Sequence, residues 1–155
     1  MVEHVALYIL SSGTSSGEAV LANIRASDFI DEINSGEGPR EDCGLYKLVQ
    51  LVTPPHSLKS ESDVLKFHTR LVKGEEKAEV EGQACTWNPL CVLIADGKDE
   101  EVVEVLQLKE GSVEERLKSK ARSAVEVASN VSVANMSIQE YKDMCGNAEV
   151  YDAGQ

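Results

Sequence analysis

Aromatic residues are scarce in this sequence. They make up 5% of its 155 residues, so any core has to be built mainly from Val, Leu, Ile and Ala. With 42% hydrophobic and 27% charged residues, the composition is typical of a folded chain rather than a disordered one. Since domains cluster at about 100–150 residues, we expect a single domain with one core.

Positive charge is also in short supply. The chain has 15 Lys and Arg against 27 Asp and Glu, which gives a formal net charge of −12. Proteins gain most of their non-specific affinity for nucleic acids from Lys and Arg contacts with phosphates. We therefore expect no nucleic acid partner, and the same repulsion disfavours anionic membrane surfaces.

Long apolar runs and cysteine clusters are missing. No stretch approaches the roughly 18 apolar residues of a membrane helix, and residues 1–10 do not form a signal peptide. The four cysteines, Cys43, Cys85, Cys91 and Cys145, are too few for a disulfide framework at this length. We predict a cytoplasmic protein with reduced thiols and no membrane insertion.

No motif for a metal or a cofactor is present. Cys85 and Cys91 are spaced too widely for the zinc knuckle, in which about two to four residues separate the ligands, and the histidines are scattered. The Gly/Ser-rich segment 12–17 lacks the Gly-Lys-Ser/Thr of a phosphate-binding loop. The sequence thus predicts neither a metal site nor a cofactor.

Cysteine chemistry would need a thiolate with a base nearby in space. Cys91, which begins an apolar stretch, and Cys145, beside Gly146, are the candidates for such a nucleophile. A buried thiol that packs as a small hydrophobic residue is the simpler interpretation of Cys91. We predict no catalytic residue, and a small cysteine-dependent enzyme remains an alternative.

Extended and helical patterns divide the chain. Apolar or alternating residues predict strands at 5–10, 19–24, 45–52, 65–71, 78–84, 90–95, 102–108 and 131–134. The first two strands are expected to form a hairpin, as are those at 65–71 and 78–84. Helices are predicted at 28–33 behind Ser27, from Ser112 and from Ser137, the last two behind the capping boxes 112–115 and 137–140.

Strands followed by helices without strict alternation are typical of the α+β class. We predict a single α+β domain at 1–148, with a mixed or antiparallel sheet packed by one long amphipathic helix and two shorter helices. Residues 53–84 are expected to form an inserted loop and hairpin, and residues 149–155 a flexible tail.

The long helix from Ser112 carries the candidate binding site. Its apolar stripe would consist of Val113, Leu117, Ala121, Ala124, Val125 and Ala128. Four basic residues lie off that stripe: Arg116, Lys118, Lys120 and Arg122. We predict that they dock a protein partner with an acidic surface, the alternative being a solvated face balanced by nearby glutamates.

The order of elements resembles the actin-depolymerising-factor homology family, which includes cofilins, coactosins and glia maturation factors. The similar segments are Val5-Ala6-Leu7-Tyr8, Asp28-Phe29-Ile30-Asp31-Glu32-Ile33, Leu45-Tyr46-Lys47-Leu48-Val49, Pro89-Leu90-Cys91-Val92-Leu93-Ile94, the helix from Ser112, Val131-Ser132-Val133-Ala134 and the helix from Ser137. The resemblance implies a mixed sheet between helices and an actin-binding or cytoskeletal role, with the long helix as the main contact.

The function predicted from the sequence is a non-catalytic protein-interaction domain, with actin as a candidate partner. Two alternatives beside the cysteine-dependent enzyme stay open. A longin-like trafficking module shares the early strand–strand–helix–strand order. A structural subunit of a larger assembly would use a sheet edge or the loop at 53–63 as its contact.

Overall fold

The structure, a computed structural model, describes residues 3–10, 16–146 and 148–153. In these residues a five-stranded mixed sheet has the order β2-β1-β3-β4-β5. β1 (Glu3–Ile9) lies between β2 (Val49–Leu51) and β3 (Thr86–Ala95) and is parallel to both. β4 (Val102–Lys109) and β5 (Ser112–Lys120) follow as an antiparallel meander. The predicted α+β class with a mixed sheet is confirmed.

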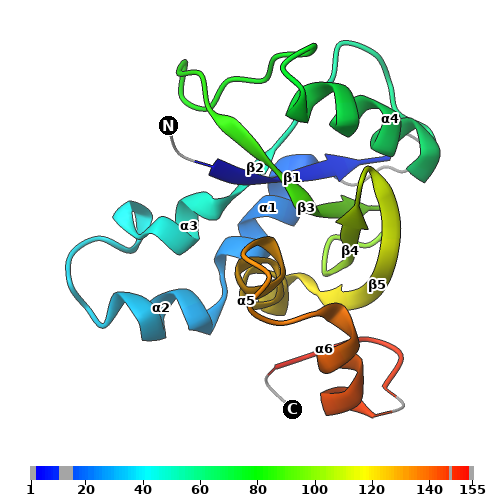
Figure 1. The fold of residues 1–155 in the computed structure, drawn as a ribbon. Helices are drawn as coiled ribbons and strands as arrows, with labels where there is room; N and C mark the ends of the chain where they lie inside the picture. The colour runs from blue at the N-terminus through cyan, green and yellow to red at the C-terminus, as the bar shows by residue number, and fades with distance from the viewer. Residues whose placement is uncertain (1–2, 11–15, 147, 154–155) are drawn as a thin grey trace.

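Helices cover both faces of this sheet (Figure 1). They are α1 (Gly17–Arg25), α2 (Asp28–Asn34), α3 (Gly44–Leu48), α4 (Glu61–Val72), α5 (Ala121–Ser132) and α6 (Ile138–Cys145), with a short 3₁₀ turn η1 (Arg40–Asp42) before α3. In Figure 1, α4 lies above the sheet, and α5 and α6 lie below it. None of the helices in the described ranges has the length and apolar character needed to cross a membrane.

The sheet separates two hydrophobic cores, and β1 contributes to both. Val5 and Leu7 point into the core shared with α1, α2, α5 and α6, whereas Ala6 and Tyr8 point into the core beneath α4. All four side chains are almost completely buried. A strand covered on both faces has apolar residues at successive positions, which is the pattern that the sequence of β1 shows.

The pairing of β1 with β3 is interrupted by a bulge. His4 lies opposite Trp87 but Ala6 lies opposite Val92, so β3 contains extra residues between these two pairs. The buried side chain of Asn88 satisfies the backbone that this bulge exposes. Its Oδ1 accepts hydrogen bonds from the backbone N–H groups of Leu90 and Cys91, at 2.8 and 3.0 Å.

The amide nitrogen of Asn88 connects the bulge to two other segments. Nδ2 donates to Oε1 of Glu3 at 2.6 Å and to the carbonyl of Ser132, at the end of α5, at 2.9 Å. The backbone carbonyl of Asn88 accepts a hydrogen bond from His68 of α4 at 2.8 Å. One buried residue therefore ties β1, β3, α4 and α5 together.

His68 completes a buried chain of hydrogen bonds. A carbonyl only accepts, so Nε2 of His68 is protonated and donates the hydrogen bond to Asn88. Nδ1 of His68 then accepts a hydrogen bond from the hydroxyl of Tyr8 at 2.7 Å. Burial lowers the pKa of His68 and raises that of Tyr8, because each charged form would lose its hydration. Both groups are neutral in the fold.

Two predicted strands are helices, and neither predicted hairpin forms. Residues 19–24 lie in α1, and residues 65–71 lie in α4. Val64, Phe67 and Leu71 of α4 are buried, and their spacing of three and four residues places them on one helix face. Phe67 and Leu71 also fit the alternation that predicted a strand. Ser60 caps this helix by accepting from the N–H of Asp63.

The predicted long helix is a strand over its first half. Glu110 and Gly111 both have positive φ, 52° and 82°, which is the conformation of a two-residue turn that pairs Lys109 with Ser112. Residues 112–120 therefore return along β4 as β5, and α5 begins only at Ala121. Its second half is confirmed, with Ala121, Ala124, Val125 and Ala128 buried as predicted.

Other predictions have mixed outcomes. The strands at 90–95 and 102–108, the Ser27 cap of α2 and the capping box of Ser137 and Glu140 are confirmed. Residues 45–48 lie in α3, residues 131 and 132 end α5, and residues 78–84 contain only the bridge between Val80 and Gln83. Most of the Gly/Ser segment 12–17 lies outside the described residues.

The predicted flexible tail is docked over the part that the structure describes. Tyr151 is buried, and its backbone forms a parallel bridge with Ser119 at the outer edge of β5. Its ring packs edge-on against Tyr141 of α6, with the centroids 5.3 Å apart. The aromatic side chain therefore anchors a segment that composition alone made look disordered.

Replacing Asn88 with alanine should destabilise the protein strongly. Asn88→Ala leaves the N–H groups of Leu90 and Cys91 without the acceptor on which they rely, and buried unpaired groups cost about 1–3 kcal/mol each. We expect a loss of about 2–4 kcal/mol in the free energy of unfolding, measured by urea denaturation. Asn88→Asp keeps an acceptor oxygen for Leu90 and Cys91 but turns its second oxygen toward the carboxylate of Glu3 and the carbonyl of Ser132, so it should destabilise the protein as well. A loss below about 1 kcal/mol in Asn88→Ala would contradict this role of Oδ1.

Stability should fall as the pH drops below about 6.5, the pKa of histidine in the unfolded chain. His68 stays neutral in the fold because burial lowers its pKa, so only the unfolded state takes up its proton in this range. The contribution of His68 to the free energy of unfolding is thus fully present above pH 6.5. Below that pH it decreases by up to about 1.4 kcal/mol per pH unit. His68→Gln should flatten this slope in urea titrations at pH 7.0, 6.0 and 5.5, and an unchanged slope would show that other groups cause it.

Candidate functional site

The four basic residues predicted to bind a partner do not lie on one helix face. Arg116, Lys118 and Lys120 belong to β5, and only Arg122 lies in α5. The alternation of the strand places Arg116 and Lys118 on the exposed side, whereas Leu117 and Ser119 are buried. The basic helix face is therefore a wrong prediction, because the helix begins after three of its four residues.

Arg116 is held by two carboxylates. Its guanidinium forms a bidentate pair with Glu61, at 2.8 and 2.9 Å, and a third contact with Glu104 at 2.6 Å. The hydrogen bonds that Arg116 donates to Glu61 contribute most to the rise in the pKa of Arg116. This side chain joins the start of α4 to β4 and β5, which is a structural task within the domain.

Arg122 is also paired within the molecule. It bonds the carboxylate of Asp152, a side chain that is only 4% exposed, and this hydrogen bond raises the pKa of Arg122. Within the described ranges, Lys118 and Lys120 are the two predicted contact residues that make no ion pair. Two of the four predicted contact residues are therefore ion-paired within the domain, and the binding of a partner by all four stays a prediction.

The cysteine candidates are not activated. Complete burial raises the pKa of the Cys91 thiol to about 12, so it stays protonated at neutral pH. The thiol of Cys145 donates to the carbonyl of Lys142 at 3.6 Å. Among the described residues, no three His, Cys, Asp or Glu side chains are grouped as a metal ion would require.

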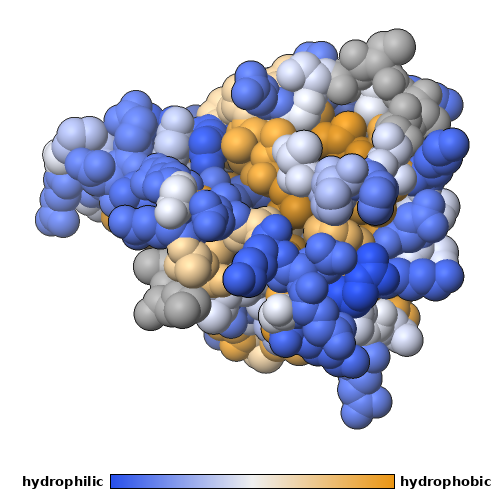
Figure 2. Space-filling view, turned by 90° about the horizontal axis from the view of Figure 1, so that it is seen from above, coloured by the Kyte–Doolittle hydropathy of each residue, from blue (hydrophilic) through white to orange (hydrophobic). Residues whose placement is uncertain are grey.

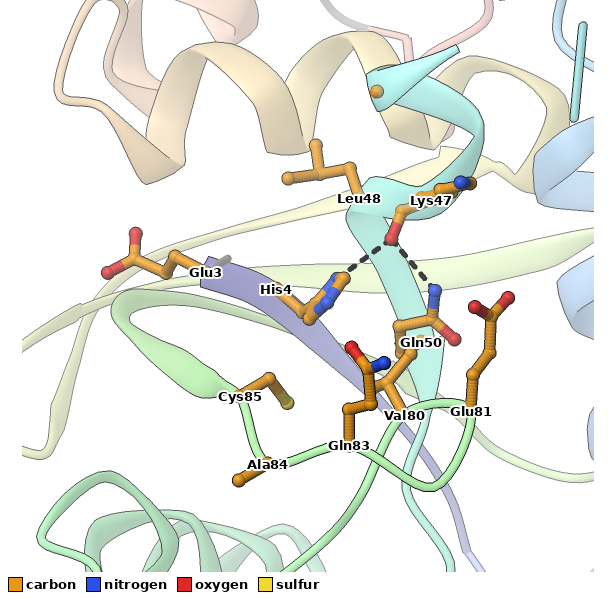
Figure 3. A pocket seen from close by; sticks show the side chains of 11 residues that line it. Glu3, His4, Lys47, Leu48, Gln50, Val80, Glu81, Gln83, Ala84 and Cys85 are labelled. Carbon is orange, nitrogen blue, oxygen red and sulfur yellow. Dashed lines mark hydrogen bonds between the residues drawn. The ribbon is translucent and has the colours of Figure 1, made fainter. Parts of the chain in front are cut away.

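A polar hollow of about 450 Å³ lies at the amino-terminal ends of β1 and β3 (Figure 3). Three segments form its walls: the start of β1, the α3–β2 segment, and the loop that precedes β3. It is lined by Glu3, His4, Gly44, Lys47, Leu48, Gln50, Val80, Glu81, Gln83, Ala84 and Cys85. We call it the His4 hollow.

The hollow follows from how the α4 face of the sheet is covered. Along β1, the residues Ala6 and Tyr8 on this face pack beneath α4, and His4 continues the same alternation toward the amino-terminal end. In Figure 1, α4 covers one end of this face and the loop before β3 lies over the other. His4 and Gln50 project beneath the loop, where no helix fills the space.

His4 has the most constrained geometry in the hollow. Its side chain is 5% exposed and packs against Trp87, with the ring centroids 6.0 Å apart. Nδ1 lies 2.8 Å from the carbonyl oxygen of Lys47, and since that oxygen can only accept, Nδ1 carries the proton. In the neutral imidazole the lone pair is then on Nε2.

Nε2 of His4 has no hydrogen-bond partner among the described residues. In the same part of the chain, every fully buried side-chain nitrogen or oxygen has a partner, so Nε2 must be accessible from outside. The hollow that His4 lines provides this access. The imidazole thus presents a fixed acceptor to any molecule that enters.

The amides and carboxylates around His4 are also mostly acceptors. Nε2 of Gln50 donates to the carbonyl of Lys47 at 2.8 Å, which leaves its Oε1 free, and Glu81 makes no ion pair in the described ranges. Figure 3 shows Gln50 and Glu81 on the same side of the hollow, with the ammonium end of Lys47 pointing away from His4. The floor is therefore rich in lone pairs.

Cys85 also lines the hollow, but it is not a nucleophile there. Its thiol donates to the carbonyl of Ala78 at 3.8 Å, and burial raises its pKa. A thiol held protonated in this way does not provide the thiolate that covalent catalysis needs. The arrangement suits reversible binding.

The surface around this side of the molecule is amphipathic. Figure 2 looks down on the side that carries α4 in Figure 1, and hydrophobic residues occupy the middle of this view with hydrophilic residues around them. A polar rim around an apolar centre is the usual anatomy of a protein–protein interface.

Sequence reasoning did not find the His4 hollow. His4 was one of three scattered histidines, and nothing in its spacing indicates a ligand site. A usable signal was present, because His4 lies two residues before Ala6 in a strand that is buried on both faces, where a polar residue needs a partner. Its partners come from residues more than forty positions away.

Thiol alkylation should distinguish the four cysteines. Cys91 is fully buried with a pKa of about 12, whereas Cys43, Cys85 and Cys145 are partly exposed. Under native conditions, iodoacetamide should modify Cys91 at least about 100-fold more slowly than Cys145, as measured by peptide mass spectrometry, because the thiolate is the reactive form. Equal rates before unfolding would contradict the packing of β3.

No protein-family model, no curated protein and no solved structure matches this chain. The resemblance to the actin-depolymerising-factor homology family stays a prediction. Four segments that supported it differ from their expected form: β1 leads to a helix rather than a hairpin, residues 45–48 lie in a helix, residues 112–120 are a strand, and residues 131 and 132 end a helix. The fold is established by its own geometry as α+β.

Proposed function

We propose that this chain is a non-catalytic protein-binding domain that receives a segment of its partner in the His4 hollow. The observation that carries the proposal is the imidazole of His4, which is 95% buried yet leaves Nε2 unpaired and accessible. An accessible acceptor whose ring is held in one orientation by a second hydrogen bond offers a partner a fixed point of contact.

The dimensions of the hollow support this proposal. Ligand sites are typically concave and measure about 300–1,000 Å³, and the His4 hollow falls within that range. Two of its walls come from β1 and β2, whose residues the sheet holds in place. Side chains fixed on a sheet are preorganised, so little ordering entropy is lost when a partner enters.

Binding is favoured over catalysis because the hollow lacks an activated nucleophile. Cys85 is protonated and bonded to Ala78, and the lone pair of His4 has no hydroxyl or thiol donor among its hydrogen bonds. Of the four basic residues predicted to meet an acidic partner, Lys118 and Lys120 make no ion pair in the described ranges, whereas Arg116 and Arg122 do. A partner segment that enters the hollow would contact more oriented hydrogen-bonding groups than a partner that binds these two lysines.

Filling the hollow tests the proposal. Ala84 is exposed and lines the hollow, so Ala84→Trp should obstruct it without disturbing either core. Ala22, on the exposed side of α1, provides the matched control Ala22→Trp. Affinity capture from the native cell extract with quantitative mass spectrometry should show proteins retained by wild type and Ala22→Trp but reduced about tenfold or more by Ala84→Trp.

The same panel also addresses the cytoplasmic, cytoskeletal form of the proposal. Actin is a defined partner, so co-sedimentation with filaments provides a purified readout of the three proteins. Proteins captured equally by wild type, Ala22→Trp and Ala84→Trp would place the binding surface elsewhere and overturn the proposed use of the His4 hollow.

A further inference from the structure

We propose that the His4 hollow recognises an arginine side chain of the partner, with the guanidinium donating to His4, Gln50 and Glu81. This inference rests on the proposed function and specifies its ligand chemistry. It follows from the balance of hydrogen-bond donors and acceptors that line the hollow.

The acceptors of the hollow are fixed by their own hydrogen bonds. His4 and Gln50 each use their nitrogen donor on the same atom, the carbonyl oxygen of Lys47. These bonds orient Nε2 of His4 and Oε1 of Gln50 as acceptors, while the second N–H of Gln50 remains as one donor beside them. A ligand that meets both must therefore donate twice.

A charged acceptor stands beside these two neutral ones. Glu81 is exposed at the rim of the hollow and is in no ion pair of the described residues. Glu3 also lines the hollow, but its Oε1 already accepts from Asn88 and its carboxylate points away from His4 in Figure 3. The preference for a cation thus depends on Glu81.

Donors are fewer in the hollow than acceptors. Lys47 directs its ammonium away from His4, and the thiol of Cys85 already donates to the carbonyl of Ala78. Gln83 contributes one amide, which can both donate and accept. A guanidinium fits this surplus of acceptors, because it is planar, always charged, and carries only donors.

The charge of the whole chain acts in the same direction. A net charge of −12 attracts cationic partners and speeds their encounter. Lysine would satisfy the charge but not the spread of acceptors, since its ammonium is a compact point charge and the guanidinium is a broad fork. Arginine is therefore expected to bind better than lysine.

The single tryptophan provides a reporter. Trp87 packs against His4 and is the only tryptophan of the chain, so its fluorescence should respond when the imidazole is engaged. Proton and nitrogen chemical shifts of the His4 ring give a second, independent readout. Both can be followed in the intact protein.

The probe is N-acetyl-arginine methylamide, with N-acetyl-citrulline methylamide as its neutral analogue and N-acetyl-lysine methylamide as the point-charge comparison. We expect saturable shifts of the His4 ring with arginine, and at least about tenfold weaker binding of citrulline. Free arginine, with its additional carboxylate, should bind more weakly than the blocked residue if the hollow serves a polypeptide. Equal binding of the free amino acid would assign the site to a small molecule and overturn the partner residue.

Variants separate this inference from the proposed function. Glu81→Gln should weaken the arginine probe about threefold to tenfold, whereas Glu79→Gln, which removes the same charge from an exposed site on the same loop, should change nothing. Equal binding of arginine and citrulline overturns the guanidinium. If the probe fails while Ala84→Trp still abolishes partner capture, arginine recognition falls and the proposed function stands; if both tests fail, both fall.

Discussion

The rest of the structure depends on the buried side chain and carbonyl of Asn88. The bulge in β3 breaks the regular pairing with β1, and a broken ladder leaves backbone groups that need new partners. The side-chain oxygen of Asn88 accepts from two of them, and its side-chain nitrogen donates to Glu3 and Ser132. Its backbone carbonyl accepts a hydrogen bond from His68. Strands, α4 and α5 meet at this one residue, so the register of the sheet and the placement of both helix layers are fixed together.

The His4 hollow is a consequence of the same interruption. β1 pairs with Thr86 and Trp87 before the bulge and with β3 again from Ala6 onward, so His4 lies just before the bulge, opposite Trp87. The carbonyl of Lys47, at the junction of α3 and β2, accepts a hydrogen bond from Nδ1–H of His4 and so sets the tautomer. Two backbone features distant in the sequence thereby convert an ordinary strand histidine into an oriented acceptor. The arginines, by contrast, serve the fold, since Arg116 and Arg122 are neutralised by carboxylates of other elements.

Much of the sheet could be predicted from the sequence. The helices beside it were predicted wrongly where the same apolar residues fit both the two-residue period of a strand and the 3.6-residue period of a helix. β1, β3 and β4 have apolar runs bounded by turn residues, and the second capping box opens α6 where expected. Residues 65–71 satisfy both an alternating and a helical pattern, and the Ser60 cap that decides between them precedes the pattern. Residues 112–115 match the capping-box pattern, but no helix begins there. The Glu110-Gly111 turn, with two positive φ angles, forms a β-hairpin instead. The hollow could not be predicted, since its partners are joined only by tertiary contacts.

The central claim is that Nε2 of His4 is a free lone pair, and the tautomer of this imidazole tests it most directly. Long-range proton–nitrogen correlation spectra of the histidine rings at neutral pH report which nitrogen carries the proton. The account predicts the Nδ1–H tautomer for His4, with a nitrogen shift of Nε2 typical of an unprotonated, accessible atom. A protonated Nε2 at neutral pH would make His4 a donor, and the acceptor-rich hollow would then no longer exist.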